Sequence, residues 1–375
     1  MRIPTWPIAE QRERDLIAQV LASPQWGGFH EIVDSFERQF AQAHQCRYGV
    51  SAANGTLTLE MALAAAGIGP GDEVIVPAIS FISTATAVSR VGATPVFVDI
   101  EPYTFNMDPD RAAEAIGPRT KAIIPVHFGG PLADMDRLMP LARQNRLFVL
   151  EDAAHAHGSE WEGRKAGSFG DAASFSFQNG KVMTAGEGGI VITSDEEFAA
   201  RMRSLANQGR RPGASHFHHF TLGTNMRITA LQAAVLVAQL ERLPAQIATR
   251  TRNAELLLRE LSGVDGIRWQ QVHPKVNRHS WYLLLGRVDA ARFGMSRDEF
   301  CRMMREAGVP CSPYYPHTLY RNPLYAAGGC RVMPCPNAEA TILDAFWIPH
   351  NVLLGDEELM REVAGVIQRR AILVK

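Results

Sequence analysis

Residues 147–158 read Leu147-Phe148-Val149-Leu150-Glu151-Asp152-Ala153-Ala154-His155-Ala156-His157-Gly158. An apolar run typical of a buried strand ends here in two carboxylates, followed by small residues and histidines. Open α/β sheets bind their ligands beyond the carboxyl ends of the strands, which is where Asp152 would lie. A buried carboxylate costs free energy unless it has a partner. Asp152 could cap a following helix, but the small residues around His155 would let a flat ligand approach the backbone.

Five more short apolar runs resemble residues 147–151 and alternate with helical segments. They cover residues 73–78, 94–99, 122–125, 172–177 and 189–193. Strands that are buried on both faces and separated by helices are typical of a parallel or mixed sheet in an α/β domain. Residues 7–43 repeat apolar positions at helical spacing, with a break at 23–28. The sequence therefore predicts two N-terminal helices and an α/β domain over roughly residues 30–240.

The C-terminal third of the chain has a different pattern. A long helix with few breakers is predicted over about residues 229–261, and the turn residues Gly263-Val264-Asp265-Gly266 end it. A strand over 280–288 and a helix over 296–307 then indicate a small α+β unit. At about 150 residues per domain, 375 residues make two domains the first expectation. We place the N-terminal helices and a large domain at residues 1–245, and a small C-terminal domain at 246–375.

The composition excludes several classes of protein. With 46% hydrophobic and 21% charged residues, the chain is expected to fold rather than to be disordered. Lysine and arginine number 38 and aspartate and glutamate 39, so the formal net charge is -1. That balance provides no net field to attract nucleic acid or an anionic membrane, and neither partner is expected. A phosphate would have to be bound by local groups.

The cysteines and the N-terminus indicate the compartment. The five cysteines are Cys46, Cys301, Cys311, Cys330 and Cys335. Their odd number and wide spacing favour free thiols in a reducing compartment, and the last two lack the paired spacing of a zinc site. The N-terminus has no apolar signal segment, and no apolar run approaches about 18 residues. We therefore expect a cytoplasmic protein.

A single lysine stands in a turn rich in glycine and serine. Residues 174–189 read Ser174-Phe175-Ser176-Phe177-Gln178-Asn179-Gly180-Lys181-Val182-Met183-Thr184-Ala185-Gly186-Glu187-Gly188-Gly189. A lone lysine is most often a solvated charge. In a partly desolvated pocket, however, a lysine amine becomes a nucleophile that forms Schiff bases with carbonyl groups. The surrounding glycines can admit a bulky cofactor.

A third segment, Ser51-Ala52-Ala53-Asn54-Gly55-Thr56-Leu57-Thr58-Leu59, leads into an alanine-rich helix. Polar residues and a glycine at a helix start can bind an anion through backbone N–H groups and the helix dipole. Neither the dinucleotide fingerprint G-x-G-x-x-G nor the P-loop pattern is present. Pyridoxal 5'-phosphate needs what the three segments together offer, because its phosphate must be held, its ring nitrogen paired with a carboxylate and its aldehyde joined to a lysine.

The order of these motifs resembles the DegT/DnrJ/StrS aminotransferases, which act on keto-sugars and keto-cyclitols. The resemblance rests on Asn54-Gly55-Thr56, Ser80-Phe81, residues 151–158, residues 174–189 and Gly223-Thr224-Asn225-Met226-Arg227, and it includes Trp26-Gly27-Gly28 and Tyr314-Tyr315-Pro316-His317. It covers nearly the whole chain. It implies a fold-type I pyridoxal phosphate enzyme, with a large α/β/α domain around a mainly parallel mixed sheet and a small C-terminal α+β domain.

The resemblance assigns the catalytic pair and the residue that stacks on the cofactor. Lys181 matches the lysine that carries the cofactor as a Schiff base and shuttles protons. Asp152 matches the partner of the pyridine N1–H. Phe81 matches the aromatic residue that stacks on the pyridine ring, although a phenylalanine after a strand is otherwise most often a core residue.

The resemblance also assigns the remaining contacts to the cofactor. Gly55 and Thr56 match groups that hold the phosphate, and Ser176 matches the phosphate serine five residues before the lysine. Asn225 matches an asparagine that reaches the phosphate of the neighbouring subunit, which implies a homodimer with shared active sites. His155 stands where many members carry glutamine, so it would contact the cofactor's phenolate oxygen, with a buried structural histidine as the alternative.

The other histidines do not indicate a metal site, and none is expected. His155 and His157 do not share a helix face, and His216, His218 and His219 lie in a loop with glycine and arginine. Arg210, Arg211 and His219 could lie at the entrance of the cleft and bind a donor carboxylate or a substrate phosphate. A solvated loop explains them equally well.

The resemblance implies a two-stage ping-pong transamination from L-glutamine or L-glutamate to a keto-cyclitol or keto-sugar. The run from Phe177 to Gly189 is similar to that of scyllo-inosose aminotransferases and of 3-amino-5-hydroxybenzoate synthase, which favours a small polyhydroxylated cyclic ketone. Three alternatives stay open: a dehydratase and aromatase like that synthase, a nucleotide-sugar aminotransferase, and a non-catalytic regulator that binds the cofactor. Intact Lys181 and Asp152 argue against the regulator, as does the absence of a basic stripe.

Overall fold

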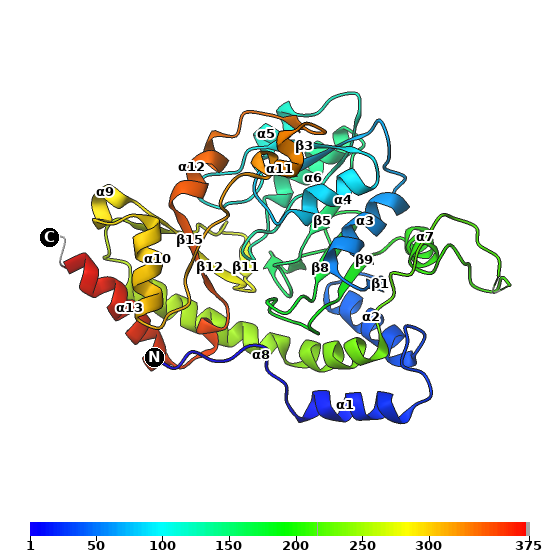
Figure 1. Cartoon of the computed structure of the whole chain (residues 1–375), viewed down its shortest axis with the longest axis horizontal. Helices are drawn as coiled ribbons and strands as arrows, with labels where there is room; N and C mark the ends of the chain where they lie inside the picture. Colours follow the sequence, from blue (N-terminus) through cyan, green and yellow to red (C-terminus); the bar gives the residue numbers. More distant parts are fainter. Residues whose placement is uncertain (216, 373–375) are drawn as a thin grey trace.

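The structure is a computed structural model that describes residues 1–215 and 217–372. Its centre is an eight-stranded sheet (Figure 1). In spatial order the strands are β1 (Tyr48–Ala52), β9 (Gly189–Thr193), β8 (Ala172–Ser176), β5 (Phe148–Asp152), β4 (Thr120–Ile123), β2 (Glu73–Pro77), β3 (Thr94–Val98) and β14 (Arg331–Val332). Among the described residues, β9 is antiparallel to both of its neighbours, and every other adjacent pair is parallel.

All six strands predicted from apolar runs are present in this sheet, each within three residues of its predicted ends. Two strands of this sheet had not been predicted. β1 contains Gly49 and Ser51, so its apolar pattern is weak. β14 has only two residues and pairs with β3 from far along the chain, a contact that no local pattern can indicate.

The sheet is buried on both faces, as the apolar runs predicted. Along β2, Ile75 packs into one core while Val74 and Val76 pack into the other. One face is covered by α2 (Glu31–Ala43), α5 (Pro109–Glu114), α6 (Met135–Gln144) and α8 (Ala230–Glu260), with α1 (Gln11–Ala22) packed on α8. The other face is covered by α3 (Gly55–Ala65), α4 (Ser83–Arg90) and α7 (Glu196–Ala206). This three-layer α/β/α arrangement confirms the predicted fold class.

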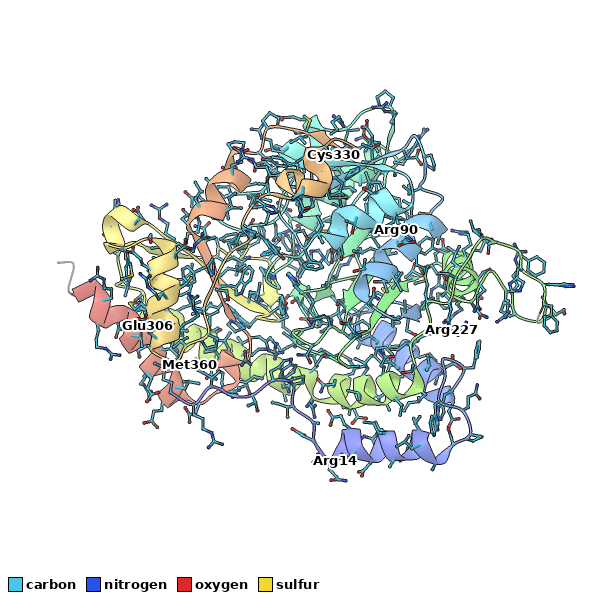
Figure 2. All side chains as sticks on the ribbon, viewed as in Figure 1. Arg14, Arg90, Arg227, Glu306, Cys330 and Met360 are labelled. Atoms are coloured by element: carbon cyan, nitrogen blue, oxygen red, sulfur yellow. The ribbon has the colours of Figure 1, made fainter. Side chains whose placement is uncertain are left out.

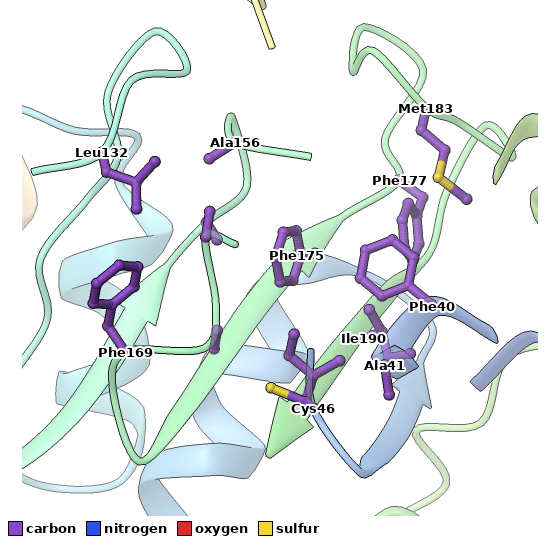
Figure 3. Packing of buried hydrophobic residues seen from close by; sticks show 14 of the residues in the cluster. Phe40, Ala41, Cys46, Leu132, Ala156, Phe169, Phe175, Phe177, Met183 and Ile190 are labelled. Carbon is purple, nitrogen blue, oxygen red and sulfur yellow. The ribbon is translucent and has the colours of Figure 1, made fainter. Parts of the chain in front are cut away.

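Aromatic rings brace the strand that leads to Lys181. Phe40 of α2 meets Phe175 and Phe177 edge-on, with centroids 5.0 and 5.4 Å apart (Figure 3). All three rings are buried. Such pairs contribute about 0.5–1.5 kcal/mol each beyond the burial of their area, so they hold the end of β8 firmly in place.

The helix α8 runs along the lower part of the molecule in Figure 1, above α1, and agrees with the helix predicted over 229–261. Its first half packs on the large sheet, while Ala254 and Leu257 belong to a separate core. That core lies in what we name the C-terminal lobe: β10 (Ile267–Trp269), β12 (Leu283–Val288), β15 (Ala345–Pro349), β13 (Ser312–Pro313), α9 (Ala290–Phe293), α10 (Arg297–Glu306) and α13 (Glu357–Ile372). β12 and α10 are the strand and the helix predicted at 280–288 and 296–307.

Part of the C-terminal third returns to the large sheet. Leu319 and Tyr325 join its core, and β14 extends its edge. The remaining elements are a small sheet of β11 (Val276–Arg278), β6 (Glu160–Trp161) and β7 (Arg164–Lys165), the helices α11 (Pro323–Ala326) and α12 (Pro336–Asp344), and the 3-10 turns at Leu319–Arg321 and Val352–Leu354. The division at residues 245 and 246 stays a prediction.

All five cysteines are free thiols, and the Sγ atoms of Cys301 and Cys311 lie 3.6 Å apart. Within the part of the chain that the structure describes, no helix combines the length and the apolarity needed to cross a bilayer.

Candidate functional site

A cavity of about 900 Å³ opens where β5 and β8 end, between the large sheet and the C-terminal lobe. Seven of the eight predicted site residues line it: Gly55, Thr56, Phe81, Asp152, His155, Ser176 and Lys181. Residues distant in sequence complete the wall, among them Tyr282 and Tyr315. Arg90, labelled in Figure 2, also contributes to the lining.

The first part of the site is a cradle for an anion at the start of α3. Asn54 caps the helix by accepting the N–H of Leu57 over 2.9 Å. A Cβ on Gly55 would stand only 2.7 Å from Cβ of Ser176, so only glycine lets β8 and α3 approach this closely. The hydroxyl of Thr56 is 2.7 Å from that of Ser83 at the start of α4. Backbone N–H groups, hydroxyls and the helix dipole together attract a phosphate without formal positive charge.

The second part is the carboxylate of Asp152, which is buried at the end of β5. Its Oδ2 accepts the hydroxyl of Thr84 over 2.7 Å, and its Oδ1 accepts the N–H of Ala154 over 3.3 Å. Burial raises the pKa of Asp152, while Thr84 and the nearby charge of Lys181 oppose that change. A desolvated carboxylate of this kind favours a ligand that brings a positively charged N–H donor.

No helix follows Asp152, so the alternative of a helix cap is not realised: residues 153–159 form turns that lead into β6. The neighbouring Glu151 has a structural task. Its carboxylate is fully buried, accepts three backbone N–H groups of residues 167–170 and pairs with His127 over 2.8 Å. Of the two adjacent acids, Glu151 therefore stabilises the loop at residues 167–170, and Asp152 faces the cavity.

The third part is Lys181, half-buried in the loop after β8. Its Nζ lies 4.6 Å from the centre of the Tyr282 ring. A cation over an aromatic face is stabilised by about 0.5–2 kcal/mol, depending on how far it is desolvated. Tyr282 was not singled out from the sequence, where it reads as the beginning of an ordinary apolar strand.

The turn before Tyr282 explains how its ring comes to face the lysine. Trp281 adopts a φ of 55°, a left-handed conformation that is strained for a bulky residue. Several hydrogen bonds hold the turn. Among them, Ser280 donates its hydroxyl to the carbonyl of His155 over 2.6 Å, and the buried Arg250 donates Nε to the carbonyl of Ser280 over 3.0 Å. The strain is thus maintained by packing at the site.

His155 lies against the ring of Tyr282, with centroids 4.3 Å apart. Its Nδ1 accepts the N–H of Gly129 over 3.2 Å, which leaves Nε2 to carry the ring hydrogen. Burial, assisted by the charge of Lys181, lowers the pKa of His155 well below its usual range. The imidazole is therefore a neutral N–H donor at the cavity wall.

Two aromatic side chains flank the space in front of Lys181. Phe81 is 58% exposed, which is unusual for a phenylalanine and excludes the core role considered for it. Tyr315 is partly buried, and desolvation raises the pKa of its hydroxyl. An exposed flat ring beside a buried carboxylate suits a ligand with a planar ring.

Asn225 is the predicted site residue that the structure does not bring to this cavity. It is exposed, and its Oδ1 accepts the N–H of Arg227 over 3.2 Å. Arg210 and Arg211 line a second cavity of about 610 Å³, together with Gly28. His219 contacts the carbonyl of Gln208 through Nδ1 over 2.7 Å. His216 lies outside the described residues.

His155 and His157 point to different surroundings, since His157 donates Nε2 to the carbonyl of Ser176 over 3.0 Å. Across residues 1–215 and 217–372, no three side chains of His, Cys, Asp or Glu are grouped so that they could hold a metal ion.

The chain belongs to the DegT/DnrJ/EryC1/StrS aminotransferase family, whose sequence pattern it matches over residues 7–368. It is thus an aminotransferase of a family that depends on pyridoxal phosphate. The fold type inferred from the sequence is confirmed.

Three relatives are similar over nearly their whole length. 3-Amino-5-hydroxybenzoate synthase of Amycolatopsis mediterranei (strain S699) is 39% identical over 97% of this chain and 96% of that protein. L-Glutamine:2-deoxy-scyllo-inosose aminotransferase of Streptomyces kanamyceticus is 38% identical over 99% of this chain and 95% of that protein. GDP-perosamine synthase of Caulobacter vibrioides (strain ATCC 19089 / CIP 103742 / CB 15) is 36% identical over 96% of both. A crystal structure of 3-amino-5-hydroxybenzoic acid synthase superposes with a TM-score of 0.93 at 37% identity, over 99% of each chain.

The cavity fits the family's cofactor. The start of α3 and the hydroxyls of Thr56 and Ser176 lie at one side of the cavity, and a buried carboxylate and a lysine line the same space. These are the three groups that pyridoxal phosphate requires.

Proposed function

We propose that this enzyme transfers the amino group of L-glutamine or L-glutamate to a keto-cyclitol or keto-sugar, with pyridoxal phosphate held by Lys181. The observation that carries the proposal is the meeting of Lys181, Asp152 and the start of α3 around one cavity. Gly55, Thr56 and Ser176 would hold the phosphate and Asp152 the ring nitrogen. Phe81 would stack on the ring, and His155 would donate Nε2–H to its phenolate oxygen.

When bound, pyridoxal phosphate supplies an aldehyde that takes up amines and a protonated ring that withdraws electrons. Asp152 keeps that ring protonated, since its desolvated carboxylate is stabilised by a charged N–H partner. Once free of the cofactor, Lys181 takes the proton from Cα of the amino donor and holds it over the face of Tyr282. In the second half-reaction Lys181 performs the same transfers in reverse, which accounts for a ping-pong scheme.

A small polyhydroxylated ring is the acceptor that we favour. Polar side chains, among them Gln178, Glu187 and Tyr315, line the cavity beside Lys181 and can bind hydroxyl groups. The relative from S. kanamyceticus, named for L-glutamine and 2-deoxy-scyllo-inosose, supports the same donor and substrate class.

A second candidate function is the one in the name of the A. mediterranei relative, 3-amino-5-hydroxybenzoate synthesis. It would use the same lysine and cofactor, with loss of water and aromatisation of an aminocyclohexenone. Its support is the 39% identity and the TM-score of 0.93 to a structure of that synthase. A nucleotide-linked keto sugar is the acceptor class that the third relative would favour.

We propose in addition a homodimer with shared active sites. The exposed Asn225, which does not reach the cavity of its own chain, would serve the phosphate of the neighbouring subunit. The cytoplasmic localisation expected from the cysteines and the N-terminus is part of the same proposal.

The test compares the wild type with Lys181→Ala and with Lys121→Ala, a control on an exposed lysine of β4. After loading with pyridoxal phosphate and reduction with borohydride, mass spectrometry should find the cofactor bonded to Lys181 in the wild type and in the control, and not in Lys181→Ala.

The wild type is then assayed with L-glutamine and, in separate arms, 2-deoxy-scyllo-inosose, an aminodehydroshikimate-type substrate and a nucleotide-linked keto sugar. Amine on the first ketone supports the proposal, and aromatic product in the second arm favours the second candidate. Amine on the nucleotide-linked sugar would favour that acceptor class. A loaded protein that neither aminates a ketone nor forms the aromatic product would contradict both candidates.

A further inference from the structure

The N-terminal segment starts near α13 and runs below α8 to α1 (Figure 1), with hydrogen bonds to Asn351 and to the loop that carries Lys181. Ile3 packs against the core of the C-terminal lobe, and the carbonyl of Pro4 accepts the side-chain amide of Asn351 over 2.8 Å. Further along, the carbonyl of Ile8 accepts hydrogen bonds from Gln239 and Arg242 of α8. The segment is thus fixed on both sides of Trp6.

The side chain of Trp6 is hydrogen-bonded to the backbone of the loop that carries Lys181. Its indole Nε1–H donates to the carbonyl of Asn179 over 3.1 Å, two residues before Lys181. Asn179 and Gly180 are exposed, and a loop of this kind moves readily unless it is tied down. The hydrogen bond from Trp6 ties the loop to a segment that is itself anchored to the C-terminal lobe.

Trp6 also approaches the lysine side chain through stacked rings. Its indole meets the ring of His350 edge-on, with centroids 4.6 Å apart. The ring of His350 in turn stacks on that of Tyr282, with centroids 6.1 Å apart, and the backbone N–H of His350 donates to the carbonyl of Tyr282 over 3.2 Å. The other end of this row is the Nζ of Lys181, 4.6 Å from the Tyr282 centroid.

We propose that Trp6 is a positioning residue for Lys181, acting on its backbone through Asn179 and on its side chain through His350 and Tyr282. This inference rests on the proposed function of Lys181. A lysine side chain that must carry a proton to and from one carbon has many rotamers to lose. Holding it from both ends removes that cost before the reaction begins, so the gain is in the rate of the chemical step rather than in substrate binding.

The row of rings is compatible with a charged lysine. Burial lowers the pKa of His350 to about 3, and the charge of Arg250 acts in the same direction. His350 is therefore neutral at physiological pH and does not repel the ammonium group. The face of Tyr282 attracts it.

The experiment uses Trp6→Phe, which keeps a ring and removes the N–H donor, and Trp6→Ala, which removes both. Trp269→Phe is the matched control, because Trp269 is a half-buried tryptophan of the C-terminal lobe that packs on Phe346 at 5.6 Å, away from the cavity. Each variant is loaded with pyridoxal phosphate and mixed rapidly with L-glutamine or L-glutamate alone. The maximal rate of the absorbance change, the half-saturating donor concentration and the induced circular dichroism of the bound cofactor are measured.

For Trp6→Phe we expect the maximal rate to fall by about three- to ten-fold, which corresponds to one neutral hydrogen bond. The half-saturating donor concentration should stay unchanged. The maximal rate of Trp6→Ala should fall further. Both Trp6 variants should lose induced circular dichroism, whereas Trp269→Phe should match the wild type. If Trp6→Phe behaves like Trp269→Phe, or changes only thermal stability, the inference is overturned. A wild type that binds no cofactor, or reacts with neither donor, would contradict the proposed function itself.

Discussion

The hydroxyl of Thr84 donates to Oδ2 of Asp152 over 2.7 Å, joining helix α4 to the end of strand β5. Because the proton of Thr84 is committed to the carboxylate, Ser80, whose Oγ lies 2.7 Å from Oγ1 of Thr84, must donate to it. Burial raises the pKa of Asp152, and the hydrogen bond from Thr84 opposes that rise. This hydrogen bond favours the carboxylate form that a cationic ring nitrogen needs.

Thr84→Val should therefore weaken cofactor binding with little change in shape. Valine keeps the branched side chain and removes the hydroxyl, so Asp152 loses a hydrogen bond to its charged form. Such a bond contributes about 1.5–3 kcal/mol, which predicts a Kd for pyridoxal phosphate raised by about ten-fold or more. Titration with pyridoxal phosphate, followed by visible absorbance, measures the change. Thr104→Val is the control, since Thr104 donates to the carboxylate of Glu101 over 2.6 Å outside the cavity. Equal affinity in Thr84→Val and the control would refute the role of Thr84.

Asp152 should make the cofactor-free protein less stable as the pH rises. Its pKa is raised in the folded state, so protonated Asp152 binds its proton more tightly there than in the unfolded chain. The associated stability is present below the usual carboxyl range and is lost as the pH rises through the raised pKa. Asp152→Asn removes this titration, so at neutral pH the cofactor-free variant should melt at a higher temperature than the wild type. The same variant should bind pyridoxal phosphate more weakly. A lower Tm for Asp152→Asn at neutral pH would contradict this account.

The residues that the local pattern alone singled out follow an apolar strand or open a helix. Asp152 and Lys181 come after apolar strands, whose carboxyl ends mark where a ligand can bind, whereas Ser176 was assigned only by the family resemblance. Thr84 and Tyr282 were missed because their local sequences resemble an ordinary helix and an ordinary strand. Both act through partners about 70 to 100 residues away, and only the tertiary fold brings those partners together.

The strands of the large sheet show the same limit of prediction from local sequence. Its central strands were predictable because burial on both faces requires continuous apolar runs. β14 was not, because two residues carry no periodicity and their pairing with β3 depends on how the chain returns from the C-terminal lobe. Trp6 precedes a proline near the N-terminus, and nothing in the local sequence indicates its contact with Asn179.

Gly55→Ala should damage the phosphate cradle by steric contact alone. The new Cβ would lie 2.7 Å from Cβ of Ser176, a distance that real Cβ atoms do not reach, so α3 or β8 must move. We expect weaker binding of pyridoxal phosphate, by about ten-fold or more for a loss above 1.4 kcal/mol. Inorganic phosphate should compete less well for the same reason. Gly117→Ala is the control, because nothing lies within 4 Å of the Cβ it would add. Unchanged affinity in Gly55→Ala would show that the cradle lies elsewhere.

Glu151→Gln should destabilise the protein and flatten its response to acid. Nδ1 of His127 accepts the N–H of Ala133 over 3.2 Å, so Nε2 carries the ring hydrogen and donates to Glu151. Burial alone would raise the pKa of Glu151, but His127 and the backbone N–H groups of Gly170 and Gly167 outweigh it, and the pKa is lowered.

The pH dependence of folding stability has the opposite sign for Glu151 and for Asp152. A lowered pKa in the folded state gives stability that is present above the usual carboxyl range and lost as the pH falls through the lowered value. Glutamine at position 151 does not titrate, so acidification removes no stability there. Its N–H₂ group also faces N–H donors that the carboxylate oxygens accept in the wild type. We expect a loss of about 3 kcal/mol at neutral pH, measured by urea unfolding of the cofactor-free protein, and a smaller loss in acid. Glu114→Gln, in an exposed pair with Arg111, should change stability by less than about 0.5 kcal/mol. An equal loss for Glu151→Gln at both pH values would mean that its carboxylate is not ionised in the folded protein.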